Sequence, residues 1–391
     1  MSRWSAIVGY SLVGAATQLV WLNFAGVTTV AATHYNVSET AIGWLAQVFP
    51  LLYVVLSIPC GLALDRWFRP ALLAGALLTA LGALVRLGGD HFAWLLAGQL
   101  IASIAQPLVL NAVTGITGRY LEEKDRPTGI AIGTASIFAG MVLAFLLSAV
   151  FPTAASLHTM LLITAAFCVL STLFLAATLR TPGPHAPAAP AVPQAIFTAL
   201  RTAWSDPLIR RLCVLAVFPF GVFVALSTFA QPLLEPAGVT STTASLILLL
   251  NVIAGVLGSA LLPIYAARHH AESPYLVTSL TTTAIACLFL AFLPSTPVAL
   301  ITITLIGLLL LPALPIVLEL VERRSTDAEG TAAGLIWLSG NLGGLLAATA
   351  VGLLVNHPRP AFLLLALLPL IALPGAHTLR HHLQTPAPTT R

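Results

Sequence analysis

Long apolar blocks separated by short polar turns make up most of this chain. A helix that crosses the hydrocarbon core of a bilayer needs about 20 mostly apolar residues. The pattern supplies twelve such blocks, at 5–32, 40–64, 71–89, 93–117, 127–151, 159–179, 212–234, 242–266, 275–293, 298–320, 330–354 and 360–377. We therefore predict an all-α integral membrane protein with 12 transmembrane helices.

Several of the polar turns carry signals for the start of a helix. Ser38 is placed to cap the second block, and Asp125-Arg126-Pro127 and Asp206-Pro207 put a proline at a first helical turn. The block 5–32 is too long for the core of a signal peptide, so we interpret it as a retained first span.

The turn Gly61–Pro70 fixes the predicted orientation. It carries the first group of charges after a long stretch in which Glu39 is the only aspartate, glutamate, lysine or arginine. Short loops rich in arginine lie on the cytoplasmic side. With the N-terminus inside, all of the 17 lysines and arginines except Arg86 and Arg359 fall on the cytoplasmic side. Both termini are therefore predicted to be cytoplasmic.

A long polar interruption at 181–211 divides the chain into two halves. It begins with a proline-rich stretch, which favours an extended conformation, and continues with an amphipathic pattern typical of a helix in the membrane interface. We predict an N-terminal six-helix bundle over 1–180, this linker over 181–211, a C-terminal six-helix bundle over 212–379 and a cytoplasmic tail over 380–391.

A weak internal repeat supports two pseudo-symmetric bundles. Gly129 and Gly133 open the fifth predicted span, and Gly330 and Gly334 occupy equivalent positions at the start of the eleventh. Coincidence in a glycine-rich chain is the alternative. Combined with the central linker, the repeat favours a duplicated transporter.

The composition excludes several classes of protein. Hydrophobic residues make up 58% of the chain and charged residues 8%, with a mean hydropathy of +0.97, whereas soluble domains carry about 25% charged residues. The net charge of +4 is dispersed over many loops, so we expect a lipid bilayer and a small-molecule substrate as partners, no nucleic acid, no cofactor, and a monomer. The cysteines form no CxxC pair, which argues against disulfides and a zinc site; they are Cys60, Cys168, Cys213 and Cys287.

The ionisable residues do not suggest an enzyme. His269-His270 and His381-His382 offer metal ligands, but a solvated cytoplasmic rim explains them better. Acidic residues are also peripheral, because Glu319 and Glu322 belong to the predicted cytoplasmic end of the tenth span. A proton relay buries such a group at depth, so the pattern argues against one and against intramembrane hydrolysis.

Neutral polar and aromatic residues occupy the middle of several spans. An amide in hydrocarbon must either face a cavity or hydrogen-bond to another helix. A purely structural hydrogen bond between helices therefore remains an alternative for each of these polar residues. An aromatic wall is also a surface on which a cationic or planar ligand stacks. The candidate substrate-binding residues are Gln18, Trp21, Asn23, Gln106, Phe223, Thr228, Gln231, Trp337 and Asn341.

The turn after the second span resembles the signature of the major facilitator superfamily, Gly-x-x-x-Asp-Arg/Lys-x-Gly-Arg-Arg/Lys. Gly61, Asp65, Arg66 and Arg69 match it, whereas Phe68 replaces its second glycine and Pro70 its last basic residue. The resemblance implies that the two halves alternate between inward-open and outward-open states. The candidate gating residues are Gly61, Asp65, Arg66, Arg69, Arg126 and Glu322.

A narrower resemblance is to the feline-leukaemia-virus-receptor-like haem and choline transporter family. It rests on Gln18–Asn23, on Gly98-Gln99 with Ala105-Gln106-Pro107, on Gly221–Thr228, and on Pro315–Glu322 with Glu329–Leu335. The resemblance implies that Trp21 and Gln106 help to line a site for a choline-like cation. Asn341 stands where that family has a glutamine, Val224 where it has a tyrosine, and Pro263–Tyr265 where an aspartate is expected.

We therefore expect a carrier that moves a small organic solute, an amine, cation or haem-like ligand, by alternating access. The solute site is expected near mid-membrane, between the halves. The protein is expected to lie in the cell membrane, which would be the inner membrane of a bacterium. On the cytoplasmic side, Asp65 is expected to accept hydrogen bonds near Glu329-Gly330, and Arg69 and Arg126 to pair with Glu322. The alternatives are a proton-coupled efflux carrier for drugs or metabolites and a non-transporting membrane receptor.

Overall fold

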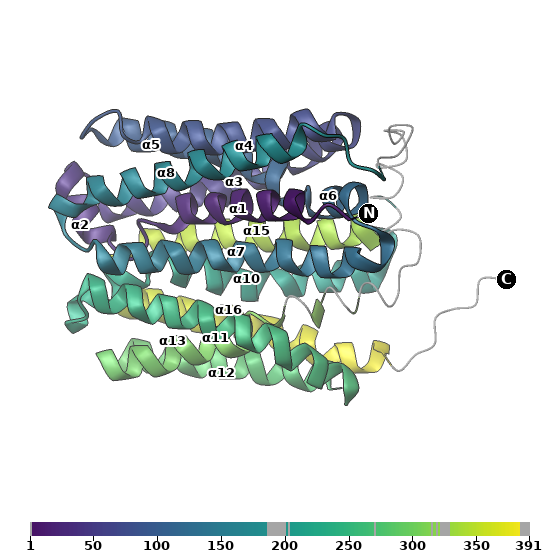
Figure 1. Ribbon diagram of the computed structural model, residues 1–391. Coiled ribbons are helices and arrows are strands. Elements are labelled where there is room, and N and C mark those ends of the chain that lie inside the picture. Colours follow the sequence, from purple (N-terminus) through teal and green to yellow (C-terminus); the bar gives the residue numbers. More distant parts are fainter. Residues whose placement is uncertain are drawn as a thin grey trace. The chain divides into compact units, whose positions relative to one another are not determined.

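A computed structural model describes residues 2–185, 201, 204–269, 271–313, 316–317, 320 and 329–383 of the chain. All regular secondary structure in these residues is helical (Figure 1). Eleven of the described helices are long and apolar enough to cross a membrane. The predicted all-α membrane fold is thus confirmed.

The helices of the first half follow one another with short turns. They are α1 (Trp4–Leu22), α2 (Thr28–Tyr35), α3 (Glu39–Arg66), α4 (Phe68–Val85), α5 (Phe92–Leu110), α6 (Val113–Tyr120), the 3-10 turn η1 (Glu123–Asp125), α7 (Arg126–Val150) and α8 (Ala154–Leu179).

The later part of the chain continues the same pattern. Its elements are α10 (Pro207–Leu234), the 3-10 turn η2 (Glu235–Ala237), α11 (Ser241–Arg268), α12 (Glu272–Phe292), α13 (Thr296–Leu310), α15 (Glu329–Leu353) and α16 (Pro358–Leu383). The helix α13 has 15 residues and is shorter than a full span. The rest of the predicted span 298–320 is described only in part, at residues 311–313, 316–317 and 320, so twelve crossings remain a prediction. The predicted interfacial helix of the linker also lies mostly outside the described residues.

The predicted helix starts are confirmed. Ser38 accepts a hydrogen bond from the Ala41 amide at 3.1 Å, and Pro127 lies in the first turn of α7. The helix α10 begins at Pro207, where the Asp206 carboxylate accepts from the Leu208 amide at 2.7 Å. A helix N-terminus leaves several backbone amide hydrogens without partners. Ser38 and Asp206 accept hydrogen bonds from such amides, and the prolines have no amide hydrogen to satisfy.

Two predicted spans are each divided into two helices. The block 5–32 contains α1 and α2 with a break at residues 23–27, and the block 93–117 contains α5 and most of α6 with a break at 111–112. At the first break, Gly26 lies so close to Ser148 and Ser245 that a Cβ would overlap both hydroxyls. At the second, the helix ends where the Asn111 amide donates to the Pro107 carbonyl and the Ala112 amide to the Val109 carbonyl.

The chain forms two compact units. Unit 1 comprises Met1–Pro193 and Ser227–Leu249, and unit 2 comprises Gln194–Leu226 and Leu250–Arg391. The last two turns of α10 and the first turns of α11 therefore belong with unit 1, whereas the remainder of both helices belongs with unit 2.

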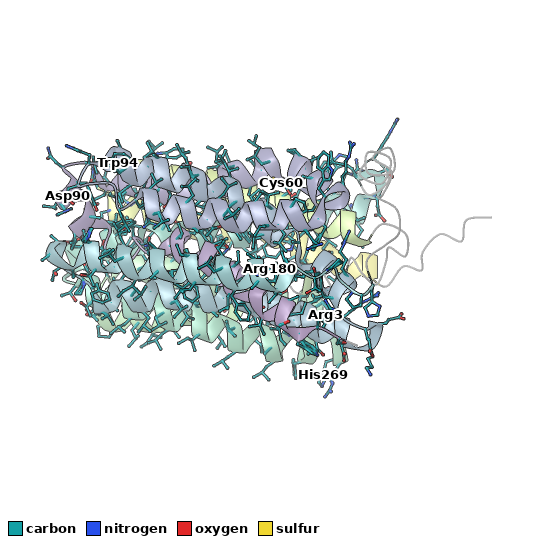
Figure 2. All side chains as sticks on the ribbon, turned by 45° about the horizontal axis from the view of Figure 1, so that its top comes forward. Arg3, Cys60, Asp90, Trp94, Arg180 and His269 are labelled. Carbon is teal, nitrogen blue, oxygen red and sulfur yellow. The ribbon has the colours of Figure 1, made fainter. Side chains whose placement is uncertain are left out.

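Unit 1 is built around α1, which is buried along nearly its whole length. It packs on α7 and α8, while α4 packs on α5 and α8, and α3 on α5 (Figure 1). Arg3 and Arg180 lie at one end of this unit, and Asp90 and Trp94 lie at the opposite end (Figure 2).

In unit 2, α12 packs on α16 and α13. A close helix contact here has an equivalent in unit 1. Gly140 of α7 abuts the backbone of Ala15 in α1, and Gly343 of α15 abuts the backbone of Val217 in α10. In both places a Cβ would overlap a carbonyl group, so only glycine permits this approach of the two helices.

Candidate functional site

The middle of unit 1 is polar, whereas its two ends are apolar. One apolar cluster takes Ile7, Tyr10 and Val13 from α1, and a second takes Phe24 and Val27 from the break after α1. The intervening segment of α1 carries buried Thr17, Gln18, Trp21 and Asn23, and the middle of α5 carries buried Gln99, Ser103 and Gln106. Candidate substrate residues from two spans thus lie between two apolar layers of the same unit.

Trp21 is buried against α3. Its indole Nε1 donates to the Ala46 carbonyl at 2.9 Å, and its ring centroid lies 6.4 Å from that of Phe49 in a tilted arrangement. The hydrogen bond satisfies the polar edge of the indole and fixes the direction of the ring. The π-face is then the part of the side chain that can receive a ligand.

Gln106 differs from the other buried amides of unit 1. It is 4% exposed, and its amide has no hydrogen-bond partner among the residues that the structure describes. Gln18 donates to the neighbouring Thr17 hydroxyl at 3.2 Å. Because burying an unpaired amide is costly, the Gln106 side chain is available for an external partner.

Asn23 takes part in a network that involves a residue sequence reasoning did not select. Its Oδ1 accepts from the Arg86 guanidinium at 2.9 Å, and its Nδ2 lies 3.5 Å from the Thr164 hydroxyl. The sequence placed Arg86 near the outer face, but the side chain is fully buried. The available signal was its position as a lone charge within the apolar block 71–89.

Thr228 and Gln231 are engaged in hydrogen bonds within unit 1. Gln47 of α3 donates to the Thr228 hydroxyl at 3.1 Å. The Gln231 carbonyl accepts from the Thr29 amide at 3.1 Å, and its amide donates to the Thr29 hydroxyl and the Glu235 carboxylate, each at 2.9 Å. Sequence reasoning missed Gln47, Thr29 and Glu235, because these partners lie far from Thr228 and Gln231 in the chain or in a turn.

Unit 2 contributes an aromatic group with one amide. Phe220 makes edge contacts with Phe223 and Trp337, at centroid distances of 6.3 and 6.0 Å. Asn341 donates to the Trp337 carbonyl one turn earlier at 2.9 Å and is 9% exposed. The structure thus brings together three predicted residues, Phe223, Trp337 and Asn341, around Phe220.

The candidate gating residues have varied surroundings. The Arg69 guanidinium donates to the carbonyls of Leu179 and Arg180, so it caps the end of α8. Arg66 is exposed and lies over the Trp67 ring, 4.6 Å from its centroid, and Gly61 has open space where a Cβ would point. Arg126 begins α7, and its Nε is buried with no hydrogen-bond partner in the described region.

Two further gating candidates cannot be placed. Asp65 lies in the last turn of α3, and its side chain is not among those described. Glu322 lies outside the described residues, as does its predicted pairing with Arg69 or Arg126.

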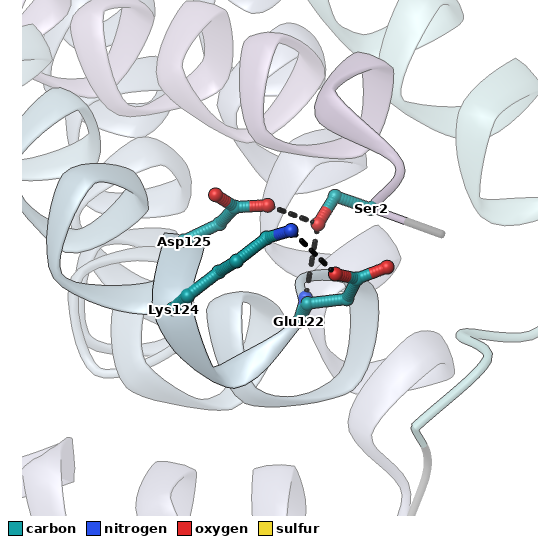
Figure 3. A network of polar contacts seen from close by, with 4 residues as sticks. All are labelled: Ser2, Glu122, Lys124 and Asp125. Atoms are coloured by element: carbon teal, nitrogen blue, oxygen red, sulfur yellow. Dashed lines mark hydrogen bonds and ion pairs between the residues drawn. The ribbon is translucent and has the colours of Figure 1, made fainter.

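At the end of unit 1 that carries Arg3 and Arg180, segments that are far apart in the sequence contact one another (Figure 2). The Ser2 hydroxyl donates to Asp125 at 2.5 Å and accepts from the Glu122 amide at 3.0 Å, and Lys124 pairs with Glu122 at 3.2 Å (Figure 3). The Tyr120 phenol donates to the Thr181 carbonyl at 3.1 Å. Burial raises the pKa of this phenol, although the neighbouring arginines oppose the shift, so it stays protonated as a donor.

The described residues contain no cluster of three or more histidine, cysteine or acidic side chains that could hold a metal ion. All four cysteines are buried and free.

Comparisons with known proteins agree with this picture. A family model described as Major Facilitator Superfamily matches residues 6–348. Solute carrier family 49 member A3 of Danio rerio is 26% identical over 359 residues, which cover 87% of this chain and 76% of the relative. The human choline/ethanolamine transporter FLVCR2 is 28% identical over 148 residues, 37% of this chain and 28% of the relative.

A solved structure shows the same fold. It is that of a bacterial homologue of the human lysosomal transporter Spinster, in an inward-facing and unoccupied conformation. The TM-score is 0.82 with 15% sequence identity, and 98% of each chain is covered.

Proposed function

Because this chain belongs to the major facilitator superfamily, and is thus a membrane transporter of a small solute rather than an enzyme, we propose that it carries a small organic amine by alternating access. Choline and ethanolamine are the first solutes to test. A human relative over part of the chain is named as a choline/ethanolamine transporter.

The observation that carries this proposal is the pairing of two features in the polar middle of unit 1. The Trp21 indole has its N–H satisfied by Ala46, which leaves a fixed aromatic face, and the buried Gln106 amide has no partner in the described region. A quaternary or primary ammonium is attracted to an aromatic face by about 2 kcal/mol when both are desolvated. An amide supplies an oxygen for a hydroxyl or ammonium hydrogen of the same solute.

The aromatic group of unit 2 is a second set of candidate recognition residues. Phe223 and Trp337 offer aromatic surface, and Asn341 replaces the glutamine of similar transporters with a shorter amide. Gln18 supports the polar middle of α1. By contrast, Asn23, Thr228 and Gln231 are engaged in hydrogen bonds within unit 1, and we assign them to holding the structure around the site.

The finer topology is also a proposal. We infer twelve crossings in two six-helix bundles, cytoplasmic termini, a monomer, and the inner membrane of a bacterium as its location. The arginine-rich end of unit 1 would then face the cytoplasm, where Gly61, Asp65 and Arg66 would act in the inner gate with Arg126 and Glu322.

Flux measurements in proteoliposomes test the function directly. Purified protein is reconstituted and uptake of labelled choline and ethanolamine is measured. We expect saturable uptake that Trp21→Ala weakens by about 30-fold in affinity, which corresponds to about 2 kcal/mol, and that Trp21→Phe weakens less. Trp94→Ala, at an exposed tryptophan, is the matched control. Absence of flux for both amines, or equal affinity in Trp21→Ala, would refute the proposal.

A further inference from the structure

Arg86 is a buried cation that the proposed substrate chemistry does not use. It follows the last residue of α4, and 1% of its surface is exposed. Within the part of the chain that is described, it forms no ion pair with a carboxylate. An arginine buried within a membrane helix bundle is costly and marks a functional position by default.

The partner of this cation is the end of α1. Its guanidinium donates to the Val20 carbonyl at 3.4 Å and to the Asn23 side chain at 2.9 Å, and it lies 5.1 Å from the centroid of the Phe24 ring. Gln99 of α5 donates to the same Val20 carbonyl at 3.1 Å. A positive charge at a helix C-terminus is stabilised by the carbonyls that have no partner there.

Two glycines make the space for this arrangement. A Cβ at Gly98 would lie 2.5 Å from Cγ of Arg86, and a Cβ at Gly82 would lie 2.5 Å from the Gly98 carbonyl. The close approach of α4 and α5 therefore leaves a slot that fits the arginine stem. The packing and the hydrogen bonds together define the position of the side chain.

The other side of the break is held by different residues. The Gly26 carbonyl accepts from Ser245 at 3.2 Å, and Thr29 at the start of α2 is bound by Gln231. The residues before the break are thus fastened to α4 and α5. Those after it are fastened to the end of α10 and the start of α11.

We propose that Arg86 is a positioning residue for transport, which clamps the end of α1 so that Trp21 keeps its place when α2 is released from Gln231. The proposal rests on the proposed function for the role of Trp21. Arg86 binds the carbonyl of the residue directly before Trp21, so loss of the clamp frees the last turn of α1.

Stability alone does not explain a cation at this position. Replacing a buried charged group and its partners by apolar residues of similar volume is often neutral or stabilising. Removing only the arginine leaves two neutral groups: the Val20 carbonyl, which still accepts from Gln99, and the Asn23 side chain, which still donates to Thr164. Arg86→Met is therefore expected to fold.

The test combines a measurement that needs no substrate with one that does. Hydrogen exchange of the peptide covering residues 20–27 is compared in the wild type, Arg86→Met and Arg86→Lys, together with the KM and kcat of choline uptake. We expect Arg86→Met to exchange at least tenfold faster in this peptide and to raise KM at least tenfold with kcat within threefold. Arg86→Lys, which keeps one donor and the charge, should recover part of both.

Each result decides one of the two proposals. Unchanged exchange in a folded Arg86→Met would overturn the clamp whatever the substrate, and faster exchange with unchanged KM would reduce Arg86 to a structural role and overturn it too. Faster exchange together with no choline flux in the wild type refutes the proposed function, and the clamp is then judged by the KM of the solute identified instead. If Arg86→Met does not fold, Gln99→Leu takes its place. It must then raise both the hydrogen exchange rate of residues 20–27 and the KM of uptake, by less than tenfold, and if neither rises the clamp is overturned.

Discussion

At the scale of single residues, the buried amide of Gln106 connects stability and function. An unsatisfied buried amide destabilises the fold by about 1 to 3 kcal/mol, and Gln106 has no partner in the described region. We predict that Gln106→Leu leaves the melting temperature equal or higher and lowers choline affinity about tenfold or more. Thermal unfolding in detergent and uptake kinetics measure the two effects. A clear loss of stability would show that Gln106 is a structural amide.

The control for this prediction is Gln99→Leu, on the same helix. Its Nε2 is hydrogen-bonded to Val20 while its Oε1 is buried without a partner in the described region, so its replacement loses one hydrogen bond and should lower the melting temperature more than Gln106→Leu does. The opposite order of the two melting temperatures would contradict the assignment.

The sequence predicted which polar residues are buried but could not predict their partners. Trp21, Asn23 and Gln231 were selected because they lie deep in apolar blocks, and all three are buried. Which of them hold other helices depends on residues far along the chain, such as Arg86 for Asn23 and Thr29 for Gln231. Hydrophobic periodicity carries no information on such pairs.

At the scale of elements, α2 is held by a set of contacts centred on Gln231. Replacing this side chain by leucine removes its hydrogen bonds to Thr29 and Glu235. A loss of about 1 to 3 kcal/mol shifts a two-state equilibrium by about five- to 150-fold. We predict that Gln231→Leu speeds hydrogen exchange in α2 and changes kcat, with choline affinity within a few fold.

The matched control is Thr33→Val on the same helix. Its hydroxyl bonds only to the Thr29 carbonyl within α2 among the described residues, so exchange outside α2 and transport should stay unchanged. If Gln231→Leu abolishes choline binding in a folded protein, Gln231 belongs to the solute site as the sequence suggested.

The elements themselves were mostly predictable. Apolar length located the spans, and Ser38 and Pro207 marked helix starts because capping and proline chemistry act locally. The breaks were not predictable from apolar length, since residues 23–27 are nearly as apolar as their neighbours. What divides the first span is a close approach at Gly26 by Ser148 and Ser245, which is a tertiary contact.

At the scale of the whole molecule, the relation between the two halves was visible in the sequence as equivalent glycines. The predicted pairs were Gly129 with Gly330 and Gly133 with Gly334. The closest equivalent contacts in the structure involve Gly140 and Gly343, each against the first helix of its half. The repeat stays a prediction, because Gly140 and Gly343 are 203 residues apart whereas the predicted pairs are 201 apart. The contacts in the structure identify which glycines allow the helices to touch.

The energy source of transport is likewise a property of the whole molecule. In the described helices, no aspartate or glutamate lies between the first and last turns. Glu272 is a buried carboxylic side chain, but it lies in the first turn of α12 and so at a helix end. A proton relay through carboxylates would need such a group at depth, and we propose uniport as the alternative to be tested.

We therefore predict that choline uptake into proteoliposomes is unchanged, within twofold, by an imposed pH gradient of either direction. With the membrane potential held at zero, accumulation should stop when internal and external choline are equal, because a uniporter equilibrates a cation only with its concentration and with that potential. Labelled choline in vesicles whose potential is clamped with equal potassium and valinomycin measures this, and Glu272→Gln is the matched variant, expected to behave as the wild type. Accumulation that follows the gradient and is lost in Glu272→Gln would establish a proton-coupled carrier instead, with the proton held by a carboxylate at a helix end.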